Sequence, residues 1–376
     1  MRYRGAMVDA ERPELLILFA SIGSGHEMAA AAIAEQIGAL SGSRLRVRAL
    51  DLMGFARVPR KRRLSAVPSM PGIGALYDAA WSARPLAGGV ASLVRLGAPW
   101  LLPHAAQQIE CGARVVVSTH ALGAILTAKM PGLRRVSVLT DLMPHAFWPR
   151  EAEVTCVPTP EARAALLARG FAAEQIAVTG IPVRAQFSHL PPSGQAKVRL
   201  GLPADRPIAL VAAGADDPGP YRQVARRLTG ILSALLEVGL MPLVLTGNDV
   251  ELREHVTARF GPRIVARPFS DDVATPMAAA DVVVAKPGGL LIAECLACGK
   301  PLVLLARGSG QERANSEYLE AHDAAIIAET ERELAEKLAS ALDGGLGPMA
   351  QRAATLGLPD AARSIAERAI ALLERG

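Results

Sequence analysis

Short apolar runs of strand length alternate with amphipathic helical segments along most of this chain. In the first half the runs begin at residues 15–20 (LLILFA) and end at residues 176–182 (IAVTGIP). Apolar runs separated by helices are typical of parallel strands, because the crossover helices bury both faces of the sheet. The first half is therefore predicted to form one doubly wound α/β sheet of six short strands.

The alternation stops and then starts again. Residues 186–205 (QFSHLPPSGQAKVRLGLPAD) have Pro, Ser and Gly but no strand-length apolar run, which indicates a connection between domains. From residue 207 a second series of runs continues to residues 324–329 (AAIIAE). We predict an N-terminal domain at 1–185, a linker at 186–205 and a second parallel α/β domain at 206–376, with a cleft between them.

Composition restricts the class of protein. Hydrophobic residues make up 51% of the chain and charged residues 20%, which excludes a disordered protein. The four cysteines, at 111, 156, 295 and 298, are too few and too scattered for a disulfide scaffold. The first apolar run is too short for a signal peptide or a membrane span. We therefore expect a globular protein in the reducing cytoplasm.

Residues 52–108 are the longest departure from the alternation, and we interpret them as an insertion in the N-terminal domain. Trp81 lies in its apolar part, and its basic cluster consists of Arg57, Arg60, Lys61, Arg62 and Arg63. Two interpretations stay open: a solvated loop with a buried helical excursion, or a patch that docks on an anionic membrane. Nucleic acid is not expected, since no aromatic-interleaved basic stripe or helix-turn-helix accompanies the cluster.

A glycine turn follows the first predicted strand. Gly23 and Gly25 would let backbone N–H groups face an anion at the start of the next helix. Met28 stands where a dinucleotide fingerprint has its third glycine, so a dehydrogenase is disfavoured although Asp51 follows the second strand. His26 is either a simple helix-start residue or a base that takes a proton from a hydroxyl.

Residues 283–319 gather polar groups at two neighbouring strand ends. Lys286 ends a buried strand, and Gly288 and Gly289 are expected to open a phosphate-sized gap. Glu294 in the next helix can accept two ribose hydroxyl hydrogen bonds. Each of these residues could also be a cap or a solvated side chain, but together they predict a sugar site. The polar residues after the next strand are Gln311, Glu312 and Asn315.

Six motifs follow one another along the chain: GxGH at 23–26, STH at 118–120, TDLMPHAFW at 140–148, VTGIPVR at 178–184, KPGGLLIAE at 286–294 and GQERAN at 310–315. Their combination and order resemble glycosyltransferase family 28, in its monogalactosyldiacylglycerol synthase and processive diacylglycerol glucosyltransferase branch. The resemblance implies a GT-B architecture, in which two Rossmann-like domains face each other across a cleft. It also implies an inverting, metal-independent enzyme, with a UDP-sugar as donor and no cofactor.

The resemblance assigns roles to individual residues. His26 matches the loop histidine proposed as base, with Asp141 as the next candidate, and Glu294 matches the ribose-binding glutamate. Phe269 lies in the loop whose backbone holds the uracil, and Lys286 and Arg184 are candidates to face the diphosphate. Other donor-side residues in this interpretation are Gly214, Asn248, Gly288, Gly289, Gln311, Glu312 and Asn315, and other phosphate- or acceptor-side residues are Gly23, Gly25, His120, His145 and Trp148.

One loop departs from the family. The branch has a glycine-rich loop after the first strand of the second domain, whereas this chain reads Ala212-Ala213-Gly214-Ala215-Asp216-Asp217. Two carboxylates would repel a diphosphate unless they point away.

The motifs and the resemblance together lead to the hypothesis that the protein transfers a hexose to a lipid such as diacylglycerol, at the inner face of the membrane. The alternatives are a soluble natural-product or cell-wall-precursor acceptor, or a non-catalytic nucleotide-sugar-binding protein.

Overall fold

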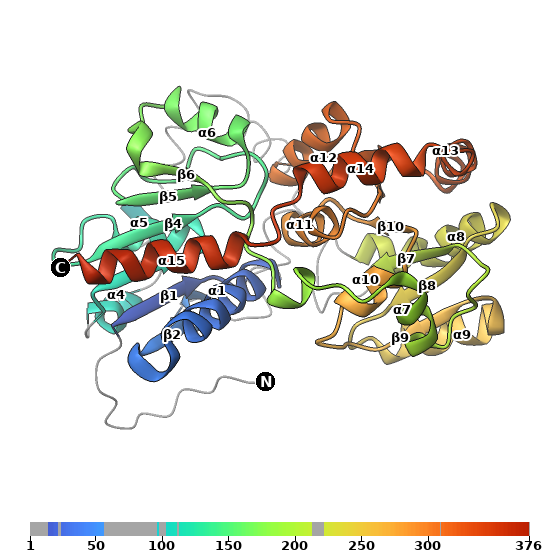
Figure 1. The fold of residues 1–376 in the computed structure, drawn as a ribbon, viewed down its shortest axis with the longest axis horizontal. Coiled ribbons are helices and arrows are strands. Elements are labelled where there is room, and N and C mark those ends of the chain that lie inside the picture. Colours follow the sequence, from blue (N-terminus) through green and yellow to red (C-terminus); the bar gives the residue numbers. More distant parts are fainter. Residues whose placement is uncertain are drawn as a thin grey trace.

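The computed structural model describes residues 14–21, 24–55, 96–97, 103–110, 113–212, 222–308 and 310–375. These residues form two α/β halves that lie side by side (Figure 1). The first half consists of β1 (Leu15–Phe19), α1 (Gly25–Ser41), β2 (Val47–Asp51), α4 (Pro103–Glu110), β3 (Val115–Ser118), α5 (Ala121–Thr127), β4 (Arg134–Val138), β5 (Val154–Val157), α6 (Pro160–Leu167) and β6 (Ile176–Val178), with 3-10 turns at Gly42–Arg44, Leu52–Phe55 and Ala173–Gln175.

The second half follows a 3-10 turn at Ala185–Phe187. It consists of α7 (Ser193–Leu200), β7 (Ile208–Ala212), α8 (Arg222–Glu237), β8 (Met241–Leu245), α9 (Val250–Phe260), a 3-10 turn at Gly261–Arg263, β9 (Val265–Arg267), α10 (Ala274–Ala279), β10 (Val282–Ala285), α11 (Gly289–Ala297), β11 (Leu302–Leu304), α12 (Gln311–Ala321), β12 (Ala325–Ile327), α13 (Glu331–Leu342) and α14 (Leu346–Leu356). The last helix is α15 (Ala361–Glu374).

Each half contains a six-stranded sheet in which neighbouring strands are parallel. The strand orders are β2-β1-β3-β4-β5-β6 and β12-β11-β10-β7-β8-β9. The predicted doubly wound sheets are therefore confirmed. In each sheet the strand order changes direction next to the first strand of that half, which is β1 or β7. Open α/β sheets bind ligands at this position, at the carboxyl ends of the strands.

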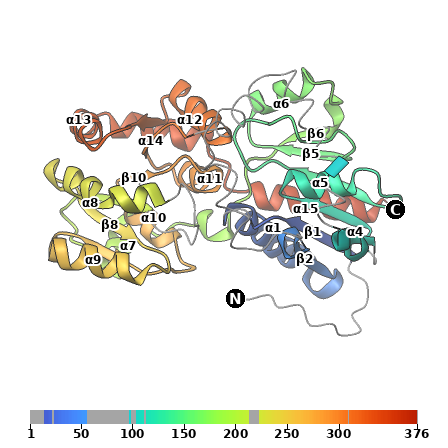
Figure 2. The ribbon, with the colours of Figure 1, turned by 180° about the vertical axis from the view of Figure 1, so that it is seen from behind.

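Alternate residues of the strands enter different cores, as the period of a strand requires. Leu15 and Ile17 pack with α1 and α15, whereas Leu16 and Leu18 pack with α4 and α5. Both faces of β1 are thus covered, which explains why this strand is apolar throughout. Figure 2 shows α4 and α5 in front of this sheet and α15 behind it.

The domain boundaries differ from the sequence-based interpretation at two places. Residues 186–205, expected to be a linker, include α7, whose Ala196 is buried in the core of the second half. The segment 206–376, expected to be one domain, ends in α15, which returns to the first sheet and buries Ile365 there (Figure 1). Both differences arise because an amphipathic helix does not specify in its own sequence which sheet covers its apolar side.

Candidate functional site

The loops at the carboxyl ends of the two sheets meet between the halves of the molecule. Helix α1, which follows β1, contacts α11, which follows β10. The loop after β4 is bonded to the second half, because the Leu142 N–H donates to Oδ1 of Asn315 over 2.8 Å. Nδ2 of Asn315 donates to Oδ1 of Asp141 and to the Pro287 carbonyl, both over 3.2 Å. Asp141 and Asn315, which are predicted site residues from the two halves, are therefore in direct contact.

His26 lies in the first turn of α1 with one ring nitrogen fixed. Its Nδ1 is 2.9 Å from the main-chain carbonyl oxygen of Thr119 and 3.1 Å from Oγ1 of Thr140. A carbonyl only accepts, so Nδ1 carries the hydrogen and Nε2 keeps its lone pair. Burial lowers the pKa of His26 to about 4, so the ring is neutral at neutral pH and Nε2 can accept a proton.

Two further histidines surround this site. The ring of His120 lies edge-on to that of His26, with the ring centroids 4.6 Å apart, and its Nδ1 accepts from the Leu122 N–H at the start of α5. Burial lowers the pKa of His120 well below its usual range and that of His145 to about 3. All three imidazoles are therefore neutral near pH 7, which keeps this region free of histidine charge.

The segment 140–148 (TDLMPHAFW) contains both site residues and core residues. Asp141 is held by Asn315, and burial raises the pKa of its carboxyl to about 6. The main-chain carbonyl of His145 accepts from Arg169, and its ring packs on Trp148 with centroids 5.6 Å apart. Trp148 is 5% exposed and packs among the apolar side chains of β5 and α6. It therefore attaches the loop after β4 to the core of the first half.

Gly289 serves a different purpose in this structure from the one expected. A Cβ at this position would lie 2.1 Å from the Thr140 carbonyl oxygen and 3.0 Å from Oδ1 of Asp141. The predicted phosphate-sized gap is therefore filled at Gly289 by the loop from the first half. Gly288 is the N-cap residue of α11, and a Cβ there would meet only Lys286, at 3.7 Å. A Cβ on Gly25 would likewise make only an ordinary contact, 3.7 Å from Leu290.

Glu294 of α11 forms a partly buried ion pair with Arg184. Nη2 of Arg184 lies 3.3 Å from Oε1 of Glu294, and Nη1 donates to the Asp271 carbonyl over 2.8 Å. Nε of Arg184 is buried without a hydrogen-bond partner among the described residues. Burial raises the pKa of Glu294 to about 7, and the charge of Arg184 opposes this rise. Arg184 thus lies beside the predicted ribose-binding residue.

The remaining donor-side residues lie on neighbouring loops of the second half. Nζ of Lys286 is 3.4 Å from Oε1 of Glu312, so these two residues are paired, and Gln311 begins α12. Phe269 is 59% exposed, and its N–H donates to the Gly247 carbonyl over 2.8 Å. Asn248 follows Gly247 on the surface. Phe269 is therefore exposed to solvent.

Asn315 is placed differently from its expected position facing the donor sugar. Its side chain is 0% exposed, and both atoms of its amide bond within the protein. It joins the two halves of the molecule instead. The expected position was wrong because the loop after β4 lies close to α12. The contact between these two segments cannot be predicted from the local sequence of either one.

Three residues that matter for the site were missed or only mentioned in the sequence interpretation. Thr119 and Thr140 hold the His26 ring, and their positions at the ends of predicted strands were the available signal. The Asp51 carboxylate accepts from the Ser21 hydroxyl over 2.8 Å and from the Met53 N–H over 2.9 Å. Asp51 therefore holds the loop that leads to the glycine turn, which is a structural task rather than a dinucleotide contact.

Several predicted residues lie outside the described ranges. These are Gly23 and Gly214, together with the proposed membrane residues Arg57, Arg60, Lys61, Arg62, Arg63 and Trp81. Their roles stay predictions. Within the described ranges, no helix combines the length and apolar character needed to cross a membrane.

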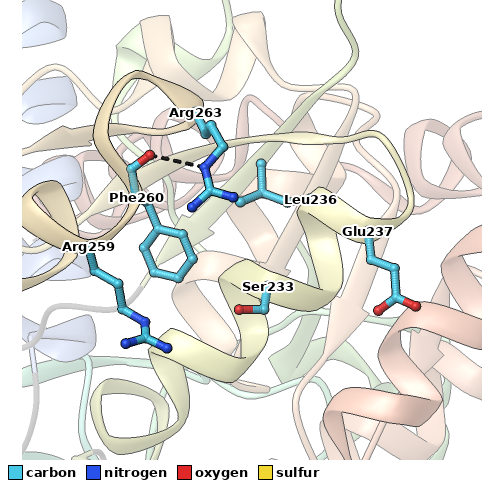
Figure 3. A pocket seen from close by; sticks show the side chains of 6 residues that line it. All are labelled: Ser233, Leu236, Glu237, Arg259, Phe260 and Arg263. Carbon is cyan, nitrogen blue, oxygen red and sulfur yellow. Dashed lines mark hydrogen bonds between the residues drawn. The ribbon is translucent and has the colours of Figure 1, made fainter.

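A hollow of about 490 Å³ lies on the second half, away from this site (Figure 3). It is bordered by Ser233, Leu236 and Glu237 of α8, by Arg259 and Phe260 of α9, and by Arg263. These residues precede β8 and β9 and therefore lie at the amino ends of those strands. The candidate site lies at the carboxyl ends, so the hollow is not part of it.

Two segments of the chain match known families. Residues 103–183 match the monogalactosyldiacylglycerol (MGDG) synthase family, and residues 239–365 match the glycosyltransferase family 28 C-terminal domain. Between them the two segments include the loop after β4, α11 and α12. The resemblance to glycosyltransferase family 28 inferred from the motifs is therefore confirmed.

Curated relatives agree at low identity. The chain is 26% identical over 210 residues to the processive diacylglycerol beta-glucosyltransferase of Bacillus subtilis (strain 168), covering 55% of this chain and 54% of that protein. It is 25% identical over 390 residues to the probable chloroplastic monogalactosyldiacylglycerol synthase of Glycine max, covering 96% and 71%. With the Bacillus protein, the match thus spans little more than half of the relative's length.

The solved structures define the architecture. The crystal structure of Acinetobacter baumannii MurG is similar with a TM-score of 0.58 and 16% identity, covering 96% of this chain and 100% of that one. At this identity the likeness concerns the fold alone. The chain has the GT-B fold, as predicted.

Proposed function

We propose that this protein transfers a hexose from a UDP-sugar to a hydroxyl of a diacylglycerol-type lipid. The observation that carries the proposal is the state of His26, a neutral imidazole whose Nδ1 is tied to the Thr119 carbonyl and whose Nε2 is available as a base. It lies where the first half meets α11 of the second half. The matches to lipid glycosyltransferases support diacylglycerol as the acceptor class.

In the proposed reaction the lipid hydroxyl attacks C1 of the sugar while Nε2 of His26 takes its proton. The bond between C1 and the diphosphate oxygen breaks, and UDP leaves with the electron pair of that bond. Because the hydroxyl attacks C1 on the face opposite to UDP, the configuration at C1 is inverted. The Lys286 ammonium would help to stabilise the charge that grows on the diphosphate. No metal is assigned a step in this mechanism.

The donor nucleoside would bind the second half. The Glu294 carboxylate is suited to accept from the ribose hydroxyls, and the exposed Phe269 ring lies on a loop at the carboxyl end of β9. The buried Nε of Arg184, which lacks a partner among the described residues, supplies one more unused donor next to Glu294. An unused buried donor supports a ligand at this place, because leaving it unbonded costs about 1–3 kcal/mol.

The test is a transfer assay with the purified chain. Radiolabelled UDP-glucose, UDP-galactose and UDP-N-acetylglucosamine are each incubated with diacylglycerol in anionic vesicles, with and without excess chelator, and the lipids are separated by thin-layer chromatography. We expect a labelled glycolipid from at least one donor, formed equally well with chelator. UDP binding without transfer to any lipid would instead indicate a binding protein, and transfer only to soluble acceptors would overturn the lipid assignment.

A further inference from the structure

Thr140 links the candidate base to the opposite half of the molecule. Its hydroxyl oxygen lies 3.1 Å from Nδ1 of His26, and the residue is 7% exposed. It stands two residues after β4, at the carboxyl end of the first sheet, and directly precedes Asp141. A buried hydroxyl in contact with a ring nitrogen can restrict both the orientation and the protonation of that ring.

The two neighbours of Nδ1 determine which nitrogen of His26 carries the hydrogen. The Thr119 carbonyl at 2.9 Å accepts only, so the hydrogen is on Nδ1 and the Thr140 hydroxyl oxygen is a second acceptor for it. Among the hydrogen bonds of the described residues, Nδ1 has these two oxygens and no carboxylate. Both oxygens turn their negative dipole ends to the ring, and therefore stabilise the charge that forms when Nε2 takes a proton.

Thr140 is itself held by the second half. Its carbonyl oxygen lies so close to α11 that a Cβ on Gly289 would come within 2.1 Å of it. The next two residues, Asp141 and Leu142, are both bonded to the amide of Asn315. The position of the Thr140 hydroxyl therefore depends on contacts with α11 and α12, and not only on the first sheet.

We propose that Thr140 is a positioning residue for His26. The Thr140 hydroxyl oxygen and the Thr119 carbonyl oxygen both accept the hydrogen on Nδ1, which keeps Nε2 without a hydrogen and holds the ring in one orientation. The importance of this role for turnover rests on the proposed function of His26 as base. In this arrangement a neutral hydroxyl and a main-chain carbonyl do what a carboxylate does beside many catalytic histidines. Because Thr140 packs against α11, the orientation of the His26 ring also depends on the half of the molecule that would hold the donor.

The kinetic test compares Thr140→Val with Thr140→Ser. Valine removes the hydroxyl at nearly constant volume, and we expect kcat to fall about 10-fold, while serine restores it to within about twofold of wild type. The KM for the UDP-sugar changes little in either variant. Thr127→Val is the matched control, because that buried threonine donates to Gly123 of its own helix over 2.9 Å. Wild-type turnover by Thr140→Val, or equal loss in both Thr140 variants, would overturn the proposal.

A second readout does not need turnover. Nitrogen-15 NMR of the histidine rings reports the tautomer directly, and we expect His26 to carry its hydrogen on Nδ1 in the wild type. In Thr140→Val the two ring nitrogens should move toward each other in chemical shift, whereas Thr140→Ser should resemble the wild type. A wild-type protein that transfers no sugar but shows these shifts would refute the proposed function and leave the positioning role intact. A neutral wild-type His26 that carries its hydrogen on Nε2 instead of Nδ1 would refute the positioning role.

Discussion

At the scale of single residues, Glu294 has the least ordinary environment among the predicted donor-side residues. Its carboxyl is 5% exposed and faces the guanidinium of Arg184 at 3.3 Å. Burial dominates the balance and raises its pKa to about 7. Between the usual carboxyl pKa and about 7 the folded protein therefore binds a proton that the unfolded chain does not, so this group's contribution to stability falls as pH rises through that window.

The same shift predicts a pH dependence of nucleoside binding. If Glu294 accepts from the ribose hydroxyls, its ionised form binds better, and the affinity for uridine should rise by up to about 10-fold between pH 6 and pH 8. Uridine is chosen because it has no phosphate that titrates in this range. Calorimetry measures this affinity for the wild type, for Glu294→Gln and for the control Glu320→Gln. Glu320 is an exposed carboxylate that is paired with Arg307. A wild-type affinity that does not change with pH would contradict the assignment.

At the scale of elements, α15 shows how a helix from the end of the chain completes the first half. Ile365, Ala366 and Ala369 pack against β1, β3 and β4. Arginines at the amino ends of two of these strands bond to the last carbonyls of the helix: Arg134 donates to Leu372 over 2.6 Å and to Arg375 over 3.3 Å, and Arg114 donates to Leu373 over 3.3 Å. Cations at this end also interact favourably with the helix dipole.

Replacing Arg134 should therefore destabilise the first half specifically. We expect Arg134→Ala to cost about 1–2 kcal/mol, which lowers the thermal midpoint by roughly 2–6 °C for a unit of this size. Arg352→Ala is the matched control, since Arg352 forms an exposed pair with Asp323 and should change the midpoint by about 1 °C or less. Calorimetric scans of the three proteins give the answer, and equal midpoints for Arg134→Ala and wild type would contradict the capping role.

At the scale of the whole molecule, the sequence was sufficient for the sheets and insufficient for the contacts between the halves. The strands were predictable because central strands such as β1 and β10 are apolar throughout and are flanked by helical patterns. His26 and Glu294 were found because each lies in a helix that follows a strand and a glycine-containing turn. The roles of Thr140 and Asn315 were not predictable, because each depends on a partner more than 100 positions away in the chain.

Membrane attachment is a prediction at the scale of the whole molecule. The predicted basic cluster lies outside the described residues, in the part of the sequence between β2 and α4, while the donor-side residues are on the second half. If the acceptor is a lipid, as proposed, the half that carries His26 has to reach the bilayer. Each basic residue contributes about 1 kcal/mol near an anionic surface, and salt screens the attraction. Replacing Arg57, Arg60, Lys61, Arg62 and Arg63 with Ser should therefore weaken co-sedimentation with anionic vesicles at low salt.

The control for this experiment is binding to neutral vesicles, which we expect to be weak for both proteins. A detergent-solubilised acceptor separates attachment from chemistry, because the five-serine variant should keep its turnover in detergent. Equal sedimentation of the variant and the wild type on anionic vesicles would exclude the docking role of the cluster.

The central claim is that Nε2 of His26 takes the proton from the acceptor, and the most direct measurement is the turnover of His26→Ala beside its affinity for UDP. We predict a loss of roughly 10² to 10⁴ in kcat with UDP affinity within about twofold of wild type. His104→Ala, which replaces an exposed histidine on α4, should keep wild-type turnover. A His26→Ala protein that transfers sugar at nearly the wild-type rate would contradict the account and would make Asp141 the residue to test next.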